Sequence, residues 1–381
     1  MKVLGACSLG GAGHLGPLTA VLDASRRRGD DVVVVAPPSM RAMVERAGHV
    51  WVGGFEPSEL EIAPIREQLP VVDAATASKL GNLELFARLA ADAMLPEVRR
   101  VVDGWRPELI VRDPCEYASA VVAAERDIAV RQVAISRSDV EWASIDVAGP
   151  ALEAHLDGLT DAVRATPYLT RFPASLDPDR FPRTVRFRDA PAAVGSLPNW
   201  WGDDDRPLLY ATFGTVFGHM STAVEGLKVL LAAVAQVDAK VLLTTGLQVD
   251  PTALGPTPPN VVVERWVDHA SVVAAASAVV CHGGSATLIG TLAAGLPLVV
   301  VPLFADQFSN AEMVTASGVG LAVDRGADGR REPLGSADVE AIRSAVEQVL
   351  RDESVGAAAQ KVATEMAAAP CADEALDDSI G

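Results

Sequence analysis

A short stretch near residue 282 has the residue types of an anion site. The apolar run Ala278–Cys281 ends in His282-Gly283-Gly284-Ser285, and an apolar-periodic segment follows at Ala286–Ala294. This pattern predicts a strand, a glycine turn and a helix start. The unpaired N–H groups and positive dipole of such a start attract a phosphate, and the glycines let it approach the backbone. Ser285 could cap the helix or donate, and His282 adds an imidazole donor.

Two more polar side chains follow the next predicted strand. Gly295 should end the helix, Leu298–Val301 should form a second buried strand, and Asp306 and Gln307 come after its carboxyl end,. Ligands bind at this edge of open α/β sheets. Asp306 accepts hydrogen bonds and Gln307 both donates and accepts, which suits adjacent hydroxyl groups of a sugar.

A histidine and an aspartate in the first half could transfer a proton. Lys2–Cys7 predicts a strand and Ser8–Gly16 a glycine-rich loop, so His14 should lie at the carboxyl edge of a sheet,. An imidazole there can take a proton from a hydroxyl near neutral pH. Asp113 follows another predicted strand, Glu108–Arg112, and could accept the Nδ1–H of His14. The structural alternatives are a histidine that caps the helix and an aspartate that starts a turn.

The same loop satisfies the GxGxxG pattern of dinucleotide-binding proteins at Gly11, Gly13 and Gly16,. In that class an acidic residue lies at the end of the second strand and binds the ribose. Here Ala36-Pro37-Pro38 occupies that place. The dinucleotide hypothesis is therefore disfavoured.

Two further residues in the second half lie at predicted strand ends. Leu208–Phe213 predicts a strand that leads into Gly214-Thr215, whose hydroxyl could donate to a phosphate or cap the next helix,. Trp266 follows the predicted strand Val261–Glu264, so its indole should be partly exposed at the sheet edge. An exposed indole can stack on a nucleobase for about 1–3 kcal/mol. The alternative is a core residue, because tryptophans are highly buried on average.

Together these motifs resemble the donor-binding signature of nucleotide-sugar-dependent glycosyltransferases of the GT-B type (family 1). More narrowly, the chain is similar to the actinobacterial enzymes that glycosylate antibiotics and other secondary metabolites. The joint order and spacing of the motifs are specific, whereas HGG alone would be weak. The matching pieces are Trp266-Val267, His282-Gly283-Gly284-Ser285, Ala293–Pro297, and Asp306-Gln307 with Asn310.

The resemblance implies a role for each position. It implies that Trp266 stacks on the nucleobase, that the backbone of Val267 reads the base edge, and that Gly214-Thr215 approaches the diphosphate opposite His282. The Gly13-His14-x-x-Pro17 neighbourhood matches the catalytic-base loop of the family. The resemblance therefore implies that His14 is the base and that Asp113 orients it.

One departure from the family pattern bears on the nucleotide. The resembled users of uridine-diphosphate sugars carry a glutamate eight residues after the motif histidine, which holds the ribose hydroxyls. This chain has Gly290 there. A ribose without its 2′-hydroxyl would miss that acid less, so the sequence favours a dTDP-sugar over a UDP-sugar.

Size and composition restrict the class of protein. The 381 residues suit two domains,. The net charge of −18 disfavours nucleic acid and anionic membranes as partners,. The four cysteines form no CxxC pair, so neither a zinc site nor a disulfide framework is suggested,. The start lacks a signal-peptide pattern, and the apolar runs are too short for a membrane span, so we expect a cytoplasmic protein.

The predicted elements indicate an α/β protein with two Rossmann-like domains, and the resemblance implies that they face each other across a cleft. The turn-rich composition places a linker at 196–206, between the domains 1–195 and 207–365. The resemblance implies that the first domain binds the acceptor, that the second binds the nucleotide sugar, and that the tail 366–381 packs back on the first domain. Scattered apolar residues of the first domain are candidates for a hydrophobic acceptor pocket: Trp51, Phe55, Leu83, Phe86, Met94 and Trp142,.

The resulting hypothesis is an enzyme that moves a (deoxy)sugar from a dTDP-sugar to a hydroxyl of a hydrophobic, polyketide-like small molecule in antibiotic biosynthesis. The resemblance implies inversion at the anomeric carbon. No cofactor or metal is expected, because the helix start and side-chain donors can offset the charge of the leaving group. The alternatives are a non-catalytic homologue, acting as an activating partner or binding module, and a nucleotide-sugar epimerase. A homodimer is among the expected oligomeric states.

Overall fold

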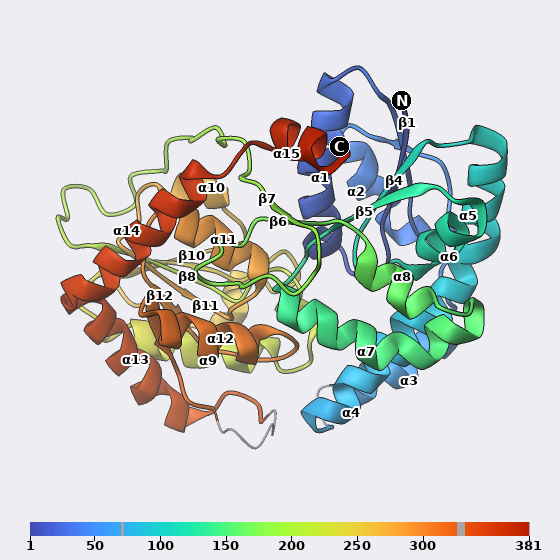
Figure 1. Cartoon of the computed structure of the whole chain (residues 1–381). Helices are drawn as coiled ribbons and strands as arrows, with labels where there is room; N and C mark the ends of the chain where they lie inside the picture. Colours follow the sequence, from blue (N-terminus) through green and yellow to red (C-terminus); the bar gives the residue numbers. More distant parts are fainter. Residues whose placement is uncertain (70–71, 326–331, 381) are drawn as a thin grey trace. The chain divides into compact units, whose positions relative to one another are not determined.

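The computed structural model describes residues 1–69, 72–325 and 332–380. The chain forms two compact units, each with its own parallel sheet and flanking helices (Figure 1). The first unit comprises Met1–Ala190 and Ala369–Gly381, and the second comprises Pro191–Ala368. The boundaries between the units, after residues 190 and 368, lie a few residues from the expected domain ends at 195 and 365. The segment expected as a linker, 196–206, belongs to the second unit.

The first unit contains a seven-stranded sheet in the order β3-β2-β1-β4-β5-β6-β7, and all paired strands are parallel. Its central strands are runs of valine, leucine and isoleucine that are buried on both faces, as parallel sheets require,. The strands are β1 (Lys2–Ala6), β2 (Asp31–Val35), β3 (Val50–Trp51), β4 (Leu109–Arg112), β5 (Ala129–Val133), β6 (Tyr168–Thr170) and β7 (Thr184–Arg186).

The helices of the first unit differ from expectation in two places. The segment Ser8–Gly16 was expected to be a loop, but α1 already begins at Ala12, because the buried period of Leu15 and Leu18 extends the helix toward its N-terminus,. The pattern of residues 136–171 is weak and predicts only short helical pieces, whereas the structure has the long helix α7 there, from Ser138 to His155. The helices are α1 (Ala12–Arg27), η1 (Pro38–Met40), α2 (Arg41–Arg46), α3 (Glu59–Gln68), α4 (Ala74–Ser78), the π-helical η2 (Lys79–Ala90), α5 (Ala91–Trp105), α6 (Tyr117–Arg126), α7 (Ser138–His155), α8 (Leu159–Ala165) and α15 (Ala372–Ile380).

The second unit contains a six-stranded parallel sheet in the order β10-β9-β8-β11-β12-β13. Its strands are β8 (Leu208–Thr212), β9 (Lys240–Thr244), β10 (Val261–Glu264), β11 (Ala278–Cys281), β12 (Leu298–Val300) and β13 (Gly320–Ala322). Its helices are η3 (Phe217–His219), α9 (Ala223–Val234), η4 (Pro251–Leu254), α10 (His269–Val273), α11 (Ser285–Ala293), α12 (Gln307–Ser317), α13 (Ser336–Arg351) and α14 (Glu353–Ala368).

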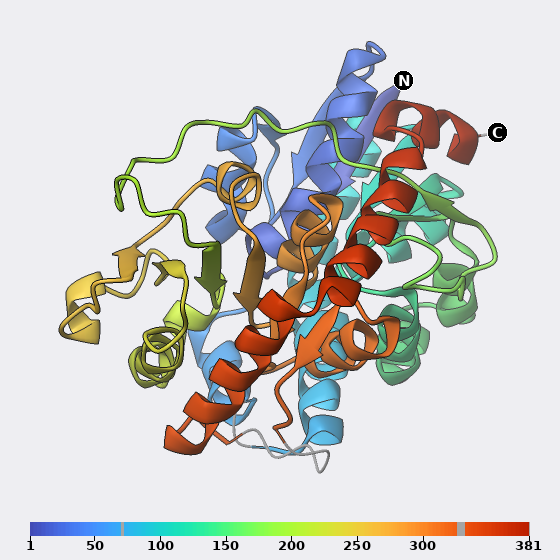
Figure 2. The ribbon, with the colours of Figure 1, turned by 90° about the vertical axis from the view of Figure 1, so that its left-hand side faces the viewer.

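The end of the chain belongs to the first unit. Figure 2 shows α15, at the red end of the chain, beside the blue α1. Ala375 and Leu376 of α15 are buried in the same apolar cluster as Leu18 of α1. Arg27 adds two hydrogen bonds to the carboxylate of Asp373. Among the helices of the described segments, none is long and apolar enough to cross a membrane.

Candidate active site

The first cluster pairs a histidine with a buried aspartate at the carboxyl edge of the first sheet. His14 lies in the first turn of α1, and Asp113 is the residue after β4. Because β1 and β4 are adjacent and parallel, with Ala6 opposite Arg112, the segments that follow them come to one edge,. His14 Nδ1 lies 3.2 Å from Asp113 Oδ1. The structure thus brings together the two residues that the sequence analysis paired.

Asp113 is fully buried and surrounded by donors. The N–H of Ser8 donates to its Oδ2 at 2.6 Å, and the N–H of Cys115 donates to its Oδ1 at 2.8 Å. Burial raises the pKa of Asp113, but the charge of His14, its hydrogen bond and the two backbone donors outweigh burial and hold this pKa below its ordinary value,. An ionised Asp113 accepts the Nδ1–H of His14, which leaves Nε2 as the basic nitrogen.

Two residues hold the ring of His14 from its sides. Gly10 has a φ of +132°, and a Cβ at this position would lie 2.2 Å from Cδ2 and 2.3 Å from Nε2 of His14. The ring of Phe86, from η2, lies at a centroid distance of 5.6 Å and a tilt of 33°. π-Helical segments often occur at functional sites. The loop and η2 together fix where the imidazole lies.

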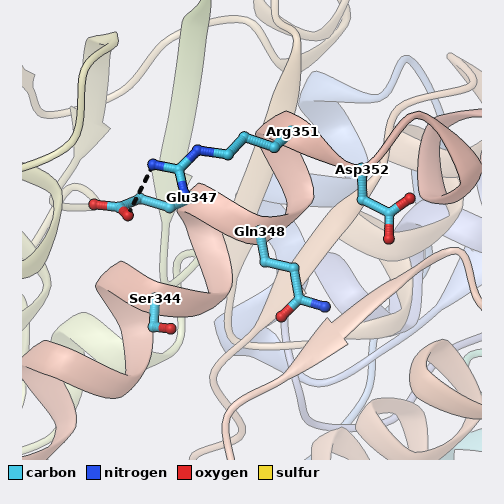
Figure 3. Close-up of a pocket in the computed structure, with 5 residues that line it drawn as sticks. All are labelled: Ser344, Glu347, Gln348, Arg351 and Asp352. Atoms are coloured by element: carbon cyan, nitrogen blue, oxygen red, sulfur yellow. Dashed lines mark hydrogen bonds and ion pairs between the residues drawn. The ribbon is translucent and has the colours of Figure 1, made fainter.

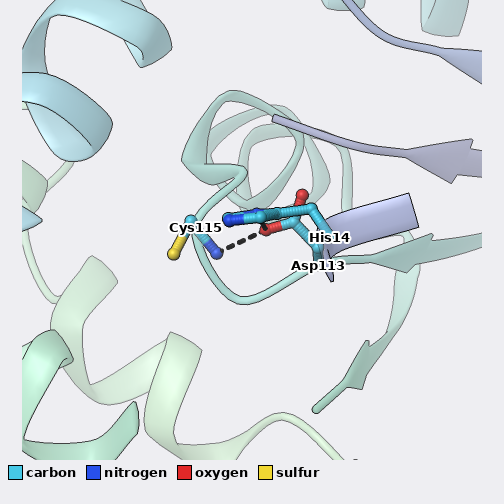
Figure 4. A group of neighbouring side chains, drawn as sticks. All are labelled: His14, Asp113 and Cys115. Atoms are coloured by element: carbon cyan, nitrogen blue, oxygen red, sulfur yellow. Dashed lines mark hydrogen bonds and ion pairs between the residues drawn. The ribbon is translucent and has the colours of Figure 1, made fainter. Parts of the chain in front are cut away.

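A thiol that the sequence analysis did not single out completes this cluster (Figure 4). The Sγ of Cys115, a ring nitrogen of His14 and a carboxylate oxygen of Asp113 all lie within 4.8 Å of one another. These ligand types suit zinc. Both oxygens of Asp113 already accept N–H groups, however, so the arrangement favours a hydrogen-bonded orienting carboxylate over a metal ligand.

The second cluster lies in the second unit, where the turns after β8 and β11 meet. These strands are adjacent and parallel, with Thr212 opposite Cys281. The imidazole of His282 lies between two glycines: a Cβ at Gly214 would be 2.8 Å from its Cε1, and a Cβ at Gly284 would be 2.5 Å from its Nε2. Both glycines are therefore needed for the ring to lie there.

His282 is neutral near pH 7. Burial lowers its pKa to about 4,. A neutral imidazole donates from one nitrogen only, and Nδ1 of His282 is buried without a hydrogen-bond partner among the described residues. His282 is therefore suited to a single hydrogen bond with an anion and not to a fixed positive charge.

The helix start at α11 is capped by Gly284, which offers no side-chain acceptor to the first N–H groups,. Ser285 does not cap the helix. Its Oγ donates to Oδ2 of Asp306 at 2.8 Å, and Nδ2 of Asn310 donates to the same oxygen at 3.1 Å and to the carbonyl of Gly283 at 2.9 Å. This network links α11 to α12 and holds the glycine turn.

The side chain of Gln307 also stabilises the loop that precedes α12. Its side chain is buried, and its Oε1 accepts the N–H groups of Leu303 and Phe304 at 2.9 and 3.0 Å. The sequence analysis expected Gln307 both to donate to and accept from a sugar. Because its carbonyl already accepts two backbone donors, only its amide nitrogen remains for that purpose.

The other residues predicted for the donor site lie just after β8 and β10. Thr215 is exposed in the turn after β8. Trp266 is 59% exposed, so it is not a core residue and its indole can stack on a planar ligand,. Val267 is half-buried beside it, and Asp268 caps α10 by accepting the N–H of Ser271.

The apolar residues predicted for an acceptor pocket differ in their exposure. Met94 is 1% exposed and belongs to the core, so it lines no pocket. Trp51 donates its Nε1–H to the carbonyl of Ala36. Leu83 and Phe86 on η2 are partly exposed, and Phe86 is the one that contacts His14.

A shallow hollow on α13 is unrelated to these clusters (Figure 3). It contains an ion pair between Arg351 and Glu347 at 3.1 Å. Its lining comes from the end of one helix and the residue that follows it, and it includes none of the residues predicted for a site: Ser344, Glu347, Gln348, Arg351 and Asp352.

Two family models match the chain. The model described as erythromycin biosynthesis protein CIII-like, N-terminal domain, matches residues 23–207, and its C-terminal counterpart matches residues 228–380. The matched segments together span most of both units.

Known proteins of similar sequence or structure are glycosyltransferases. The elloramycin glycosyltransferase ElmGT of Streptomyces olivaceus is 32% identical over 351 residues, which cover 84% of this chain and 85% of that protein. The crystal structure of the glycosyltransferase SnogD from Streptomyces nogalater matches with a TM-score of 0.75 and 25% identity, over 100% of this chain and 98% of that chain. The spinosyn rhamnosyltransferase SpnG matches over the full length of both chains, with a TM-score of 0.80 and 22% identity.

Proposed function

Because the chain belongs to the erythromycin biosynthesis protein CIII-like family of glycosyltransferases and has the GT-B fold, we propose that it moves a (deoxy)sugar from a dTDP-sugar to a hydroxyl of a hydrophobic, polyketide-like natural product. The observation that carries the proposal is the contact of His14 with the buried carboxylate of Asp113. A neutral imidazole with an ionised carboxylate on Nδ1 is the arrangement of a general base for a hydroxyl.

We propose that the reaction inverts the anomeric carbon. Nε2 of His14 takes the proton of the acceptor hydroxyl as its oxygen forms a bond to the anomeric carbon, and the bond from that carbon to the diphosphate oxygen breaks. The electron pair leaves with the diphosphate, and Asp113 stabilises the imidazolium. Attack on the face opposite the leaving group inverts the configuration.

The leaving diphosphate would be stabilised by the second unit without a metal. The start of α11 provides backbone N–H groups, and Thr215 and His282 each provide one side-chain donor. Trp266 would stack on the thymine, and the backbone of Val267 would read its edge. The amide of Gln307 and the carboxylate of Asp306 would contact the sugar. Solved structures include SpnG in complex with thymidine diphosphate and with spinosyn aglycone, so a protein of this fold binds both ligand classes.

Nucleotide binding tests the donor assignment. We expect thermal stabilisation by dTDP to exceed that by UDP at equal concentration, and NAD to have no effect; a ligand at a hundred times its Kd adds about 2.7 kcal/mol. Trp266→Ala should weaken dTDP binding by about 5- to 150-fold in Kd, because a stacked base contributes about 1–3 kcal/mol.

Phe55→Ala is the matched control, since Phe55 is a similarly exposed aromatic residue of the other unit, 56% exposed. Stabilisation by NAD alone, or by none of the three ligands, would overturn the donor assignment. An epimerase would instead release a free sugar isomer in the absence of any acceptor.

A further inference from the structure

The last residue of β4 is a buried arginine. The strand reads Leu-Ile-Val-Arg, and its final side chain, Arg112, is fully buried like the three apolar ones before it. A guanidinium is always charged at neutral pH, and burying a charge is costly unless hydrogen bonds compensate for the lost water. The neighbours of Arg112 must therefore supply those hydrogen bonds.

The guanidinium of Arg112 binds the turn that follows β4. Its Nη2 donates to the carbonyl of Pro114 at 2.9 Å, and its Nε donates to the carbonyl of Glu116 at 2.8 Å. Its Nη1 donates to the side-chain oxygen of Gln132, which lies opposite Arg112 on the adjacent strand β5. The ring centroid of Tyr117 lies 5.3 Å from the central carbon of the guanidinium. The planar, rigid group of donors thus fastens this turn to the sheet.

The peptide bond between Pro114 and Cys115 connects Arg112 to Asp113. Its carbonyl oxygen accepts from Arg112, and its N–H donates to Oδ1 of Asp113 at 2.8 Å. This peptide bond is trans, and the C=O and N–H of a planar trans peptide point in opposite directions. A guanidinium that holds the carbonyl on one side therefore fixes the direction of the N–H on the other. Oδ1 is also the oxygen that lies 3.2 Å from Nδ1 of His14.

We propose that Arg112 is a positioning residue for the base. It holds the carbonyl of Pro114 and so aims the N–H of Cys115 at the buried carboxylate. It thereby fixes the carboxylate of Asp113, which orients the imidazole of His14. Without the guanidinium, the peptide plane can turn about its flanking single bonds, and the carboxylate loses a donor. The proposal rests on the proposed function, because it assumes that His14 is the base.

Arg112→Met tests the proposal in an assay of sugar transfer. Methionine is a flexible, unbranched side chain that can fill the buried space, and it removes the donors. We expect kcat to fall by about tenfold to a hundredfold, the effect of losing one hydrogen bond to a charged group. The Kd for dTDP should not change, because Arg112 belongs to the first unit and the residues assigned to the nucleotide belong to the second.

The same substitution in a His14→Ala protein separates positioning of the base from general support of the fold. If Arg112 acts through the imidazole, Arg112→Met should lower kcat by less than about twofold once His14 is absent. A purely structural defect would lower kcat by the same factor in both backgrounds.

Arg112→Lys is the conservative variant. It keeps the charge but not the planar group of donors, so it should cause a smaller loss of kcat with the same dependence on His14. It takes the place of Arg112→Met in this comparison if the methionine variant does not fold.

Arg131→Met is the matched control, since Arg131 is a buried arginine of β5, 7% exposed, whose Nη1 donates to the carbonyl of Val130 in its own strand. We expect it to keep the wild-type kcat. If Arg112→Met transfers sugar at the wild-type rate, or loses the same factor with and without His14, the proposal is wrong while the base assignment stands. If His14→Ala alone leaves kcat close to the wild-type value, the base assignment of the proposed function fails first.

Discussion

At the scale of single residues, two histidines at the carboxyl edges of their sheets have opposite surroundings. His14 faces the buried carboxylate of Asp113, whose lowered pKa keeps a negative charge ready to stabilise an imidazolium,. His282 faces two glycines and no carboxylate, and burial lowers its pKa to about 4. The first environment suits a group that must accept a proton, and the second suits a neutral donor. Sequence reasoning found both histidines, but only packing shows how their environments differ.

Gly10 gives a test of positioning at this scale. Gly10→Ala should lower the rate of sugar transfer by about a hundredfold, the usual cost of a misplaced general base. The new Cβ would overlap the ring of His14, and a φ of +132° is unfavourable for alanine,. The measurement is kcat, taken well below the melting temperature of the variant.

The control for this variant is Gly16→Ala, because Gly16 lies in the same segment and a Cβ there meets nothing within 4 Å. We expect Gly16→Ala to keep its activity, and the Kd for dTDP to be unchanged in both variants. A Gly10→Ala protein that transfers sugar at the wild-type rate would show that Gly10 does not position the imidazole.

At the scale of elements, the positions and the ends of the main strands could be predicted from sequence, whereas the strand order, the helix starts and the side-chain networks could not. The valine-rich runs and glycine turns predict parallel strands, and parallel strands bring their ends to one edge. The early start of α1 depends on tertiary burial of Leu15, which overrides the glycine content of that segment,. The contact between Phe86 and His14 joins positions far apart in the chain, so no local pattern signals it. Gln307 matched a sugar-binding motif, but its Oε1 holds a loop.

A buried acid in the first turn of α7 holds the segment between β5 and α7 and should have a measurable pH signature. Oε1 of Glu141 accepts the N–H groups of Ile135 and Ser136, both at 2.8 Å. Burial raises the pKa of Glu141 from 4.5 to about 8 and outweighs these hydrogen bonds,. Between these values the unfolded chain releases a proton that the folded protein keeps, so this group makes the folded state less stable as pH rises from about 4.5 to about 8.

Glu141→Gln should remove this pH dependence. Near pH 4.5 the variant and the wild-type protein should unfold at similar temperatures, and at pH 8 the variant should be more stable, because each unit of pKa difference corresponds to about 1.4 kcal/mol. Glutamine is isosteric with the protonated acid and keeps the acceptor for the two N–H groups. Melting curves across this pH range, with the exposed Glu312→Gln as control, measure the effect. Parallel curves for Glu141→Gln and the wild-type protein would refute it.

At the scale of the whole molecule, the first unit is built from both ends of the chain, and the second unit from the residues between them. The last residues, from Ala369 on, belong to the first unit, where Arg188 bridges to Cys371 and Leu376 is buried at 1% exposure. The sequence analysis expected this tail to return to the first domain only because similar enzymes do so. The tail is acidic and short, and its local pattern gives no sign that Leu376 is a core residue.

The measurement that tests the central claim most directly is sugar transfer from a dTDP-sugar to an acceptor hydroxyl, with EDTA present. We predict that the wild-type protein forms an inverted glycoside, and that His14→Ala lowers kcat by about 10²–10⁴, the typical contribution of a general base. The Kd for dTDP should not change. His49→Ala is the control, since Nε2 of His49 also lies close to an aspartate, 3.3 Å from Oδ1 of Asp23, and His49 has no proposed role. Transfer by His14→Ala at a rate close to that of the wild-type protein would contradict the assignment of His14 as the catalytic base.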